Sequence, residues 1–218
     1  MLRLQAEIDL GLHLCLADRT LCPVDFEIGS ELAKTHFPSL NQFYWKLLSR
    51  QIPRVHLRDL IVEQYDLFIK KTGRPPDFID GHLHAHQLPV VRQALIEFVR
   101  TLPAGEQPYV RNTRMCMKEL RRRKLPMRKA FLIGRFGAKM LRGLEMNGIE
   151  TNAGFTGIYD FRNASCYARY LAGFAAGIEE PNALLVVHPG QSEAWRRAEF
   201  NALSDFEFVP RKPNRFLR

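Results

Sequence analysis

The stretch DFIDGHLHAH, residues 77–86, decides how this sequence is interpreted. Its apolar start predicts a short buried strand, and after Asp80 histidines occupy alternate positions, at His82, His84 and His86. In an extended chain all four side chains would share one face, about 6.6 Å apart. Imidazole is the commonest metal ligand, and a neighbouring carboxylate can bind the ion, orient a ligand or act as a general base. The stretch therefore predicts a metal site at the carboxyl end of a strand.

Strand-like and helix-like segments alternate along the chain, which is typical of a mostly parallel sheet with crossover helices. Strands are predicted at residues 9–16, 77–80, 109–111 and 183–187, and helices at 41–49, 55–71, 90–102 and 165–178. Gly73 is placed to end the second helix. The 218 residues contain no internal repeat or low-complexity linker, so we expect one α/β domain over residues 1–218, with a loose tail at 210–218.

Two further histidines lie in or directly after apolar strands. His13 is inside the first predicted strand, and His188 follows the last one, before Pro189 and Gly190. Active sites of α/β barrels and open sheets lie at the carboxyl ends of their strands. We therefore expect three strands to deliver histidines to one rim, although alone His13 could be a core histidine and His188 a turn residue.

Several other classes of protein are not supported. Four cysteines occur without a CxxC pair, which excludes a zinc ribbon and favours reduced thiols in the cytoplasm. No run of about 18 apolar residues is present, so no transmembrane segment is expected. The sequence also lacks GxSxG, Walker and GxGxxG motifs, which leaves a serine triad, a P-loop and a dinucleotide site without support.

The net charge of +9 is concentrated in one segment. Residues 111–142 contain twelve lysines and arginines against Glu119 alone, a local charge of +11, and their helical pattern is broken at Pro126. No nucleic-acid motif and little aromatic interleaving accompany this charge, so no nucleic-acid partner is expected. The segment could be a solvated pair of basic helices, or it could contact an anionic membrane surface or an acidic ligand. A homo-oligomer is also possible.

Four motifs in order resemble the YdjC-like family of chitooligosaccharide deacetylases and hopanoid-biosynthesis-associated proteins. They are GLHL at 11–14, GRPP at 73–76 leading into IDGHLHAH at 79–86, LP at 88–89 and HPG at 188–190. The likeness extends from about residue 8 to about residue 205. It implies a TIM-barrel-like fold and hydrolysis of acetyl groups from N-acetylated sugars with a divalent ion, most often Mg²⁺, with Zn²⁺ and Mn²⁺ as alternatives.

The resemblance also implies roles for individual residues. His13 and His82 would be the metal ligands, and His188 would act as general acid on the leaving amine. Arg111 would hold substrate or orient a carboxylate. His84 and His86 are expected on the substrate side of the site.

The chain departs from the family pattern at its start. Family members open with a strand that ends in an Asp-Asp pair, and no such pair occurs here. Asp9 shares the strand face of His13 but lies about 13 Å away in an extended chain, too far to share its ion. Asp80 is the local substitute for the catalytic carboxylate. By this comparison we expect an N-terminally incomplete barrel without its first βα unit, with weakened or absent activity.

Two alternatives remain beside the deacetylase interpretation. One is another metal-dependent hydrolase on the same rim, acting on an amide or a phosphoester, which participation of Asp80 and His84 in binding the ion would favour. The other is a degenerate family member that serves as a binding or membrane-surface partner through residues 111–142.

Overall fold

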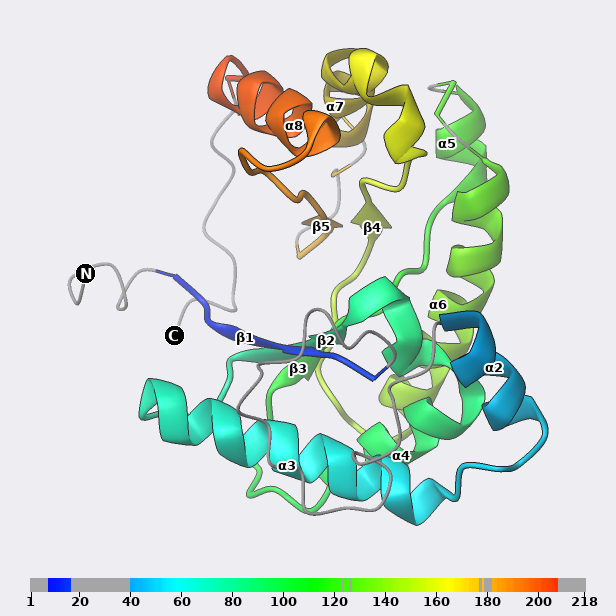
Figure 1. Ribbon diagram of the computed structural model, residues 1–218, viewed down its shortest axis with the longest axis vertical. Coiled ribbons are helices and arrows are strands. Elements are labelled where there is room, and N and C mark those ends of the chain that lie inside the picture. Colours follow the sequence, from blue (N-terminus) through cyan, green and yellow to red (C-terminus); the bar gives the residue numbers. More distant parts are fainter. Residues whose placement is uncertain are drawn as a thin grey trace. The chain divides into compact units, whose positions relative to one another are not determined.

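The computed structural model describes residues 8–16, 40–122, 124–125, 127–176, 178 and 182–207. The chain divides into two compact units, which are described separately (Figure 1). Unit 1 comprises Met1–Arg111 with Arg142–Thr151, and unit 2 comprises Asn112–Leu141 with Asn152–Arg218. The expected single domain stays a prediction, and the tail at 210–218 lies outside the described residues. Within the described part of the chain, no helix is long and apolar enough to cross a membrane.

Unit 1 contains a parallel sheet whose register places the site. Its strands are β1 (Gly11–Leu14), β2 (Phe78–Gly81) and β3 (Tyr109–Val110), in the order β1-β2-β3. Leu12 pairs with Ile79 and His13 with Asp80. Leu12 and Ile79 are buried on one face of the sheet, so His13 and Asp80 lie side by side on the other.

Helices of unit 1 form where the apolar residues recur at helical spacing. They are α2 (Leu40–Leu48), α3 (Arg54–Thr72) and α4 (Pro89–Val99), and α3 packs on α4 and on β1. The buried face of α3 is made by Leu57, Leu60, Ile61 and Tyr65. The helix ends at Gly73, whose φ of 77° is left-handed and whose N–H donates to the Ile69 carbonyl at 2.8 Å. The predicted end of this helix is confirmed.

Unit 2 combines helices with a two-stranded parallel sheet. Its elements are α5 (Met117–Arg122), α6 (Arg128–Met146), β4 (Phe155–Thr156), the 3₁₀ turn η3 (Phe161–Cys166), α7 (Tyr167–Ala175), β5 (Leu184–Leu185) and α8 (Ala194–Ser204). Helix α6 belongs to unit 2 as far as Leu141, and its remaining residues belong to unit 1. Strands β4 and β5 pair in parallel. The core is rich in aromatic side chains, among them Tyr159, Tyr167 and Phe174.

The predicted α/β class, with helices and short parallel strands, is confirmed. Three local expectations differ. The strand predicted as buried at 183–187 is β5, whose Leu184 and Leu185 are only half-buried. The helix predicted from residue 165 begins with the turn η3, and α8 was not predicted.

Candidate functional site

The three histidines after Asp80 do not form an extended ladder. Strand β2 ends at Gly81, and η2 (His82–Gln87) is a 3₁₀ segment in which Leu83 and His84 have φ values of 52° and 59°. Side chains make left-handed backbone unfavourable, so contacts around this turn hold it. The prediction that Asp80 and the histidines share one face is wrong, because the segment is not extended. Histidines that alternate with Leu83 and Ala85 have the sequence pattern of a strand, but these residues form a turn.

Gly81 provides the space in which this turn is fixed. A Cβ atom at Gly81 would lie 2.8 Å from Nδ1 and 3.0 Å from Cβ of His86, so the imidazole packs directly on the glycine backbone. His86 is fully buried, and its Nε2 lies 2.9 Å from the carbonyl oxygen of Arg111. Burial, followed by the charge of Arg111, lowers the pKa of His86 to about 3. The neutral ring therefore donates to the chain at the end of β3.

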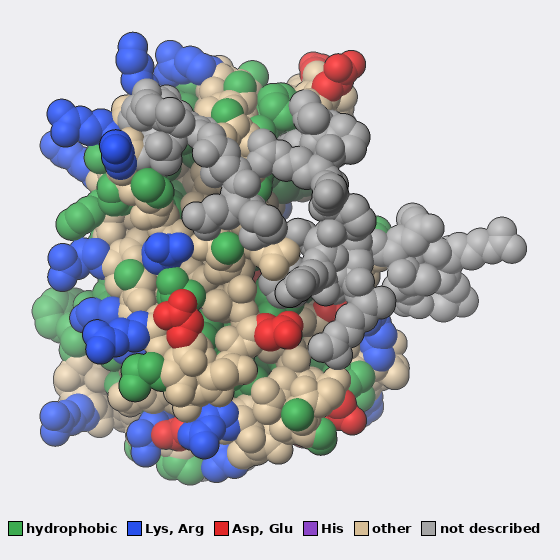
Figure 2. All heavy atoms as spheres, turned by 180° about the vertical axis from the view of Figure 1, so that it is seen from behind, with side chains coloured by type: hydrophobic (Ala, Val, Ile, Leu, Met, Phe, Trp, Pro, Cys, Tyr) green, Lys and Arg blue, Asp and Glu red, His purple; other side chains and the backbone are tan. Residues whose placement is uncertain are grey.

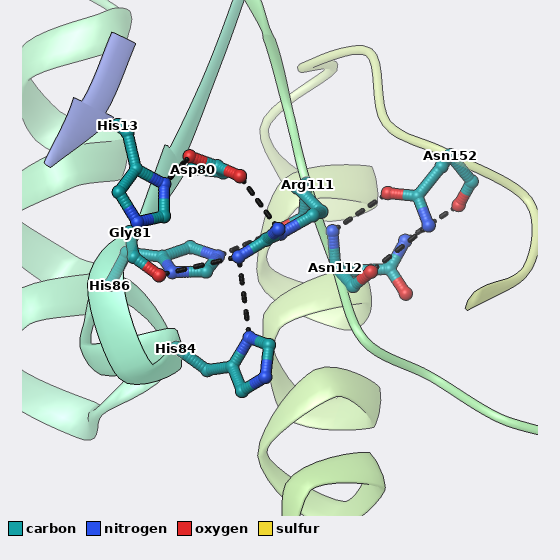
Figure 3. A network of polar contacts seen from close by, with 8 residues as sticks. All are labelled: His13, Asp80, Gly81, His84, His86, Arg111, Asn112 and Asn152. Atoms are coloured by element: carbon teal, nitrogen blue, oxygen red, sulfur yellow. Dashed lines mark hydrogen bonds and ion pairs between the residues drawn. The ribbon is translucent and has the colours of Figure 1, made fainter. Parts of the chain in front are cut away.

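Asp80 is the centre of a buried polar network (Figure 3). Its Oδ1 lies 2.5 Å from Nδ1 of His13, the residue paired with it across the sheet. Its Oδ2 lies 2.6 Å from Nη1 of Arg111, and both of these side chains are less than a tenth exposed. Nη2 of Arg111 lies 3.3 Å from the Gly81 carbonyl and 3.3 Å from Nδ1 of His84. Residues at the carboxyl ends of β1, β2 and β3 thus converge on one carboxylate.

The charge state of Asp80 follows from these partners. Burial alone would raise the pKa of the Asp80 carboxyl, but the hydrogen bond with His13 and the charge of Arg111 outweigh it and lower the pKa to about 2. A carboxylate accepts hydrogen bonds only, so Nδ1 of His13 donates to Asp80 and Nε2 is the ring nitrogen not engaged in this bond. Asp80 is therefore ionised at neutral pH and suited to orienting His13 and Arg111.

His13 and His82 bring two imidazoles together beside Asp80. Their ring centroids are 5.7 Å apart in an edge-to-face arrangement. The His13 side chain is 53% exposed, and that of His82 is half-buried. A histidine that binds a metal through one nitrogen commonly donates from the other to a carboxylate, which is the relation between His13 and Asp80. This donor chemistry fits a divalent ion held by His13 and His82.

His188 lies in unit 2 and is positioned by a carboxylate that was not predicted. Glu199 of α8 is fully buried, and it accepts hydrogen bonds from the Tyr159 hydroxyl at 2.7 Å and from the backbone N–H of His188. Nδ1 of His188 is 3.9 Å from Oε1 of Glu199. Burial alone would raise the pKa of Glu199, but the bonds from His188 and Tyr159 lower it. The His188 side chain remains 41% exposed.

Aromatic rings border His188 on two sides. The rings of Phe161 and Trp195 are stacked with centroids 4.1 Å apart, and each meets the His188 ring edge to face. Each ring of the stack also contacts a cation. Nζ of Lys129 is 4.9 Å from the centre of the Phe161 ring, and the Arg196 guanidinium is 4.7 Å from the centre of the Trp195 ring. These rings therefore hold His188 in place while their faces are covered by protein side chains.

The comparison with known protein families is decided by one match. The family model described as YdjC-like protein matches residues 1–210. The chain belongs to the YdjC-like family. A separate comparison with curated proteins found no match.

Family membership confirms the resemblance and leaves the individual roles in this YdjC-like protein as predictions. The structure brings His13, Asp80, His84, His86 and Arg111 together in unit 1, with His82 beside His13. His188 belongs to unit 2, so its place on the same rim stays a prediction. Among the described residues, no group of three or more His, Cys, Asp or Glu side chains is arranged to hold a metal ion.

Two features of the YdjC-like chain were not predicted from its sequence. Glu199 carries a signal, because it lies at helical spacing from Trp195 and Leu203 on the apolar side of α8, where an acidic residue is unusual. The second is a reciprocal amide pair in unit 2. Asn112 N–H donates to Oδ1 of Asn152 at 2.8 Å, and Nδ2 of Asn152 donates to the Asn112 carbonyl at 3.0 Å (Figure 3). Forty residues separate the partners, and no local pattern marks such a pair.

Proposed function

We propose that this YdjC-like protein is a hydrolase that removes acetyl groups from N-acetylated sugars or oligosaccharides with a divalent ion, Mg²⁺ first, with Zn²⁺ and Mn²⁺ as alternatives. One observation carries the proposal. In a member of this family, Asp80 fixes the tautomer of His13 at 2.5 Å, beside a second imidazole from His82. The TIM-barrel-like architecture implied by the resemblance is part of the same proposal.

His13 and His82 would hold the ion. With Nδ1 of His13 donating to Asp80, Nε2 is the nitrogen with a lone pair, which suits an imidazole ligand. When bound, a divalent ion polarises an acyl carbonyl and lowers the pKa of a water molecule. The chain's own contribution is to orient the His13 imidazole through Asp80, with the His82 ring beside it, before the ion arrives.

Arg111 would connect the buried Asp80 to the side chain that contacts substrate. Its guanidinium is held by Asp80 at 2.6 Å and lies 3.3 Å from Nδ1 of His84, which is half-buried. We propose that His84 contacts the sugar. His86 is fully buried on the Arg111 carbonyl, which supports a positioning role for His86 in place of the expected contact with substrate. Asp80 has both oxygens engaged and a pKa of about 2, which favours orientation over general-base work.

His188 would supply the proton that the leaving amine needs. Its backbone N–H and the side of its ring that carries Nδ1 face Glu199, and its side chain is 41% exposed. The buried carboxylate of Glu199 holds the backbone of His188 and lies beside Nδ1, which positions the ring. Glu199 is then a positioning residue that acts through His188.

Calorimetric titration of the metal-stripped chain with Mg²⁺, Zn²⁺ and Mn²⁺ tests the metal site first. We expect saturable binding that His82→Ala abolishes and that His56→Ala, a histidine on α3 away from this network, leaves unchanged. Folded wild-type protein that binds none of the three ions would overturn the metal-dependent proposal.

The reaction is tested by acetate release from N-acetylated chitooligosaccharides, with and without a chelator. We expect release that the chelator and His13→Ala each abolish. Metal binding with no acetate release, together with chelator-sensitive cleavage of another amide or of a phosphoester, would favour the other hydrolase class on the same site.

A further inference from the structure

We infer that the exposed side of α6 is an interface for an anionic lipid bilayer surface. The side in question is formed by Met127 before the helix and, within it, by Arg128, Phe131, Leu132, Arg135 and Lys139, and is called the α6 face below. It uses none of the residues assigned to hydrolysis, so it is independent of the proposed function.

The opposite side of α6 is already packed. Ala130 and Met140 are fully buried, and Ile133 contacts the core of unit 2. At Gly137 the helix approaches the backbone so closely that a Cβ atom would lie 2.3 Å from the Thr113 carbonyl carbon. The inner side therefore fixes the rotation of the helix, and the α6 face is presented outward.

Large apolar side chains stand exposed on the α6 face. Leu132 is 60% exposed and Phe131 51%, and Met127 is also exposed. Isolated exposed apolar residues are ordinary, but three within six positions at the start of one helix form a cluster that water solvates poorly. Burial of these three side chains in an apolar environment outside the protein would therefore be favourable.

Positive charge surrounds the same cluster. Arg128, Arg135 and Lys139 are exposed on the α6 face, and the sequence has no acidic residue between Glu119 and Glu145. The Arg135 guanidinium lies 5.8 Å from the Phe131 ring centre. At the left of Figure 2, Lys and Arg side chains are seen with hydrophobic side chains between them.

The combination of charge and apolar groups selects the partner. A helix that lies in a membrane interface buries Phe and Leu among the acyl chains while Lys and Arg reach the anionic headgroups. Nucleic acid would satisfy the charges, but its phosphate-lined surfaces gain little from Leu132 or Met127. An anionic bilayer surface is the partner that binds both the apolar and the basic side chains of the α6 face.

Flotation of the full chain with phosphatidylcholine vesicles, alone or mixed with phosphatidylglycerol, tests the inference. We expect binding to the mixed vesicles only, weakened between about 0.1 M and about 1 M salt. The double variant Arg135→Gln/Lys139→Gln should bind on the order of 30-fold more weakly, since each basic residue near such a surface contributes about a fivefold factor. Its matched control is Lys70→Gln/Lys71→Gln, an exposed basic pair on α3, which should bind as wild type.

The apolar contribution is tested with Phe131→Ser/Leu132→Ser, which should weaken binding at least about tenfold at both salt concentrations. Trp45→Ser, which removes a 69% exposed apolar side chain from α2, should have no effect. Both positions of the test variant are exposed, so circular dichroism should show folded protein. The inference is overturned if wild type ignores the mixed vesicles, if both test pairs behave as their controls, or if the chain binds duplex DNA while ignoring vesicles.

Discussion

Asp80 and Glu199 are buried carboxylates beside histidines, and their hydrogen-bond partners differ in kind. Asp80 in unit 1 is shared between an imidazole at 2.5 Å and a guanidinium at 2.6 Å. Glu199 in unit 2 accepts from the Tyr159 hydroxyl and a backbone N–H, and the His188 ring is 3.9 Å away. The first network depends on a fixed positive charge and the second mainly on neutral donors. Removal of a partner should therefore cost far more in unit 1.

Arg111→Met should produce the largest loss of stability. It leaves the Asp80 carboxylate buried without its cation, which costs about 3–5 kcal/mol in comparable cases. Urea denaturation would measure the change, and Arg100→Met, at an exposed arginine after α4, should stay within about 0.5 kcal/mol of wild type. Adding Asp80→Asn to Arg111→Met should restore part of the loss; a double variant as unstable as the sum of its parts would refute the coupling.

Glu199→Leu should cost less, about 1–3 kcal/mol, because it leaves a buried hydroxyl and one N–H without their acceptor. Glu199→Gln keeps one acceptor oxygen and should lie between Glu199→Leu and wild type. The same denaturation assay ranks the variants. A loss for Glu199→Leu equal to that for Arg111→Met would remove the proposed distinction between the two networks.

Asp80→Asn should weaken metal binding by about 10- to 100-fold, since the amide no longer fixes the His13 tautomer as a carboxylate does. Calorimetric titration of the metal-stripped variant gives the affinity. Asp77→Asn is the matched control, because Asp77 pairs with Arg74 and lies outside the Asp80 network. Unchanged affinity in Asp80→Asn would show that Asp80 serves the fold alone.

The smallest predicted effect is the change in stability between about pH 6.5 and about pH 5.5. His86 is held neutral with a pKa of about 3, while an unfolded histidine titrates near 6.5, so the unfolded state takes up the proton first. Stability is therefore full above about pH 6.5 and falls as pH drops toward 3, by about 1 kcal/mol between pH 6.5 and 5.5. The Asp80 contribution is lost only lower, as pH falls from about 3.8 to about 2.

Denaturation at a series of pH values would separate these contributions. His86→Gln should flatten the dependence between pH 6.5 and 4, whereas Leu57→Ala, a buried substitution that destabilises without removing a titrating group, should keep it. If the two variants have the same slope, His86 is not the group responsible.

Most of unit 1 could be predicted from the sequence, because its signals are local. Apolar spacing predicted a helix at residues 55–71, which the structure has at Arg54–Thr72, and Gly73 predicted its end. The position of His13 and Asp80 in apolar strands indicated that they meet at one edge. The left-handed turn at Leu83 and His84 could not be predicted from the sequence, because neither residue type favours that conformation. Contacts of His86 with Gly81 and with the Arg111 carbonyl hold the turn. Glu199 was missed for a related reason, because its partners Tyr159 and His188 are distant in the chain.

Gly81 has a consequence for how this protein tolerates sequence change. The residue carries no functional group, yet any side chain there would displace the His86 ring, and with it the support of the Arg111 carbonyl. In a saturation mutagenesis screen scored on activity, position 81 should accept glycine alone and would rank beside His13 and His82, the proposed metal ligands. Any residue at position 81 would keep the carbonyl that lies 3.3 Å from Nη2 of Arg111, so intolerance there would reflect the space that the His86 ring occupies and not side-chain chemistry.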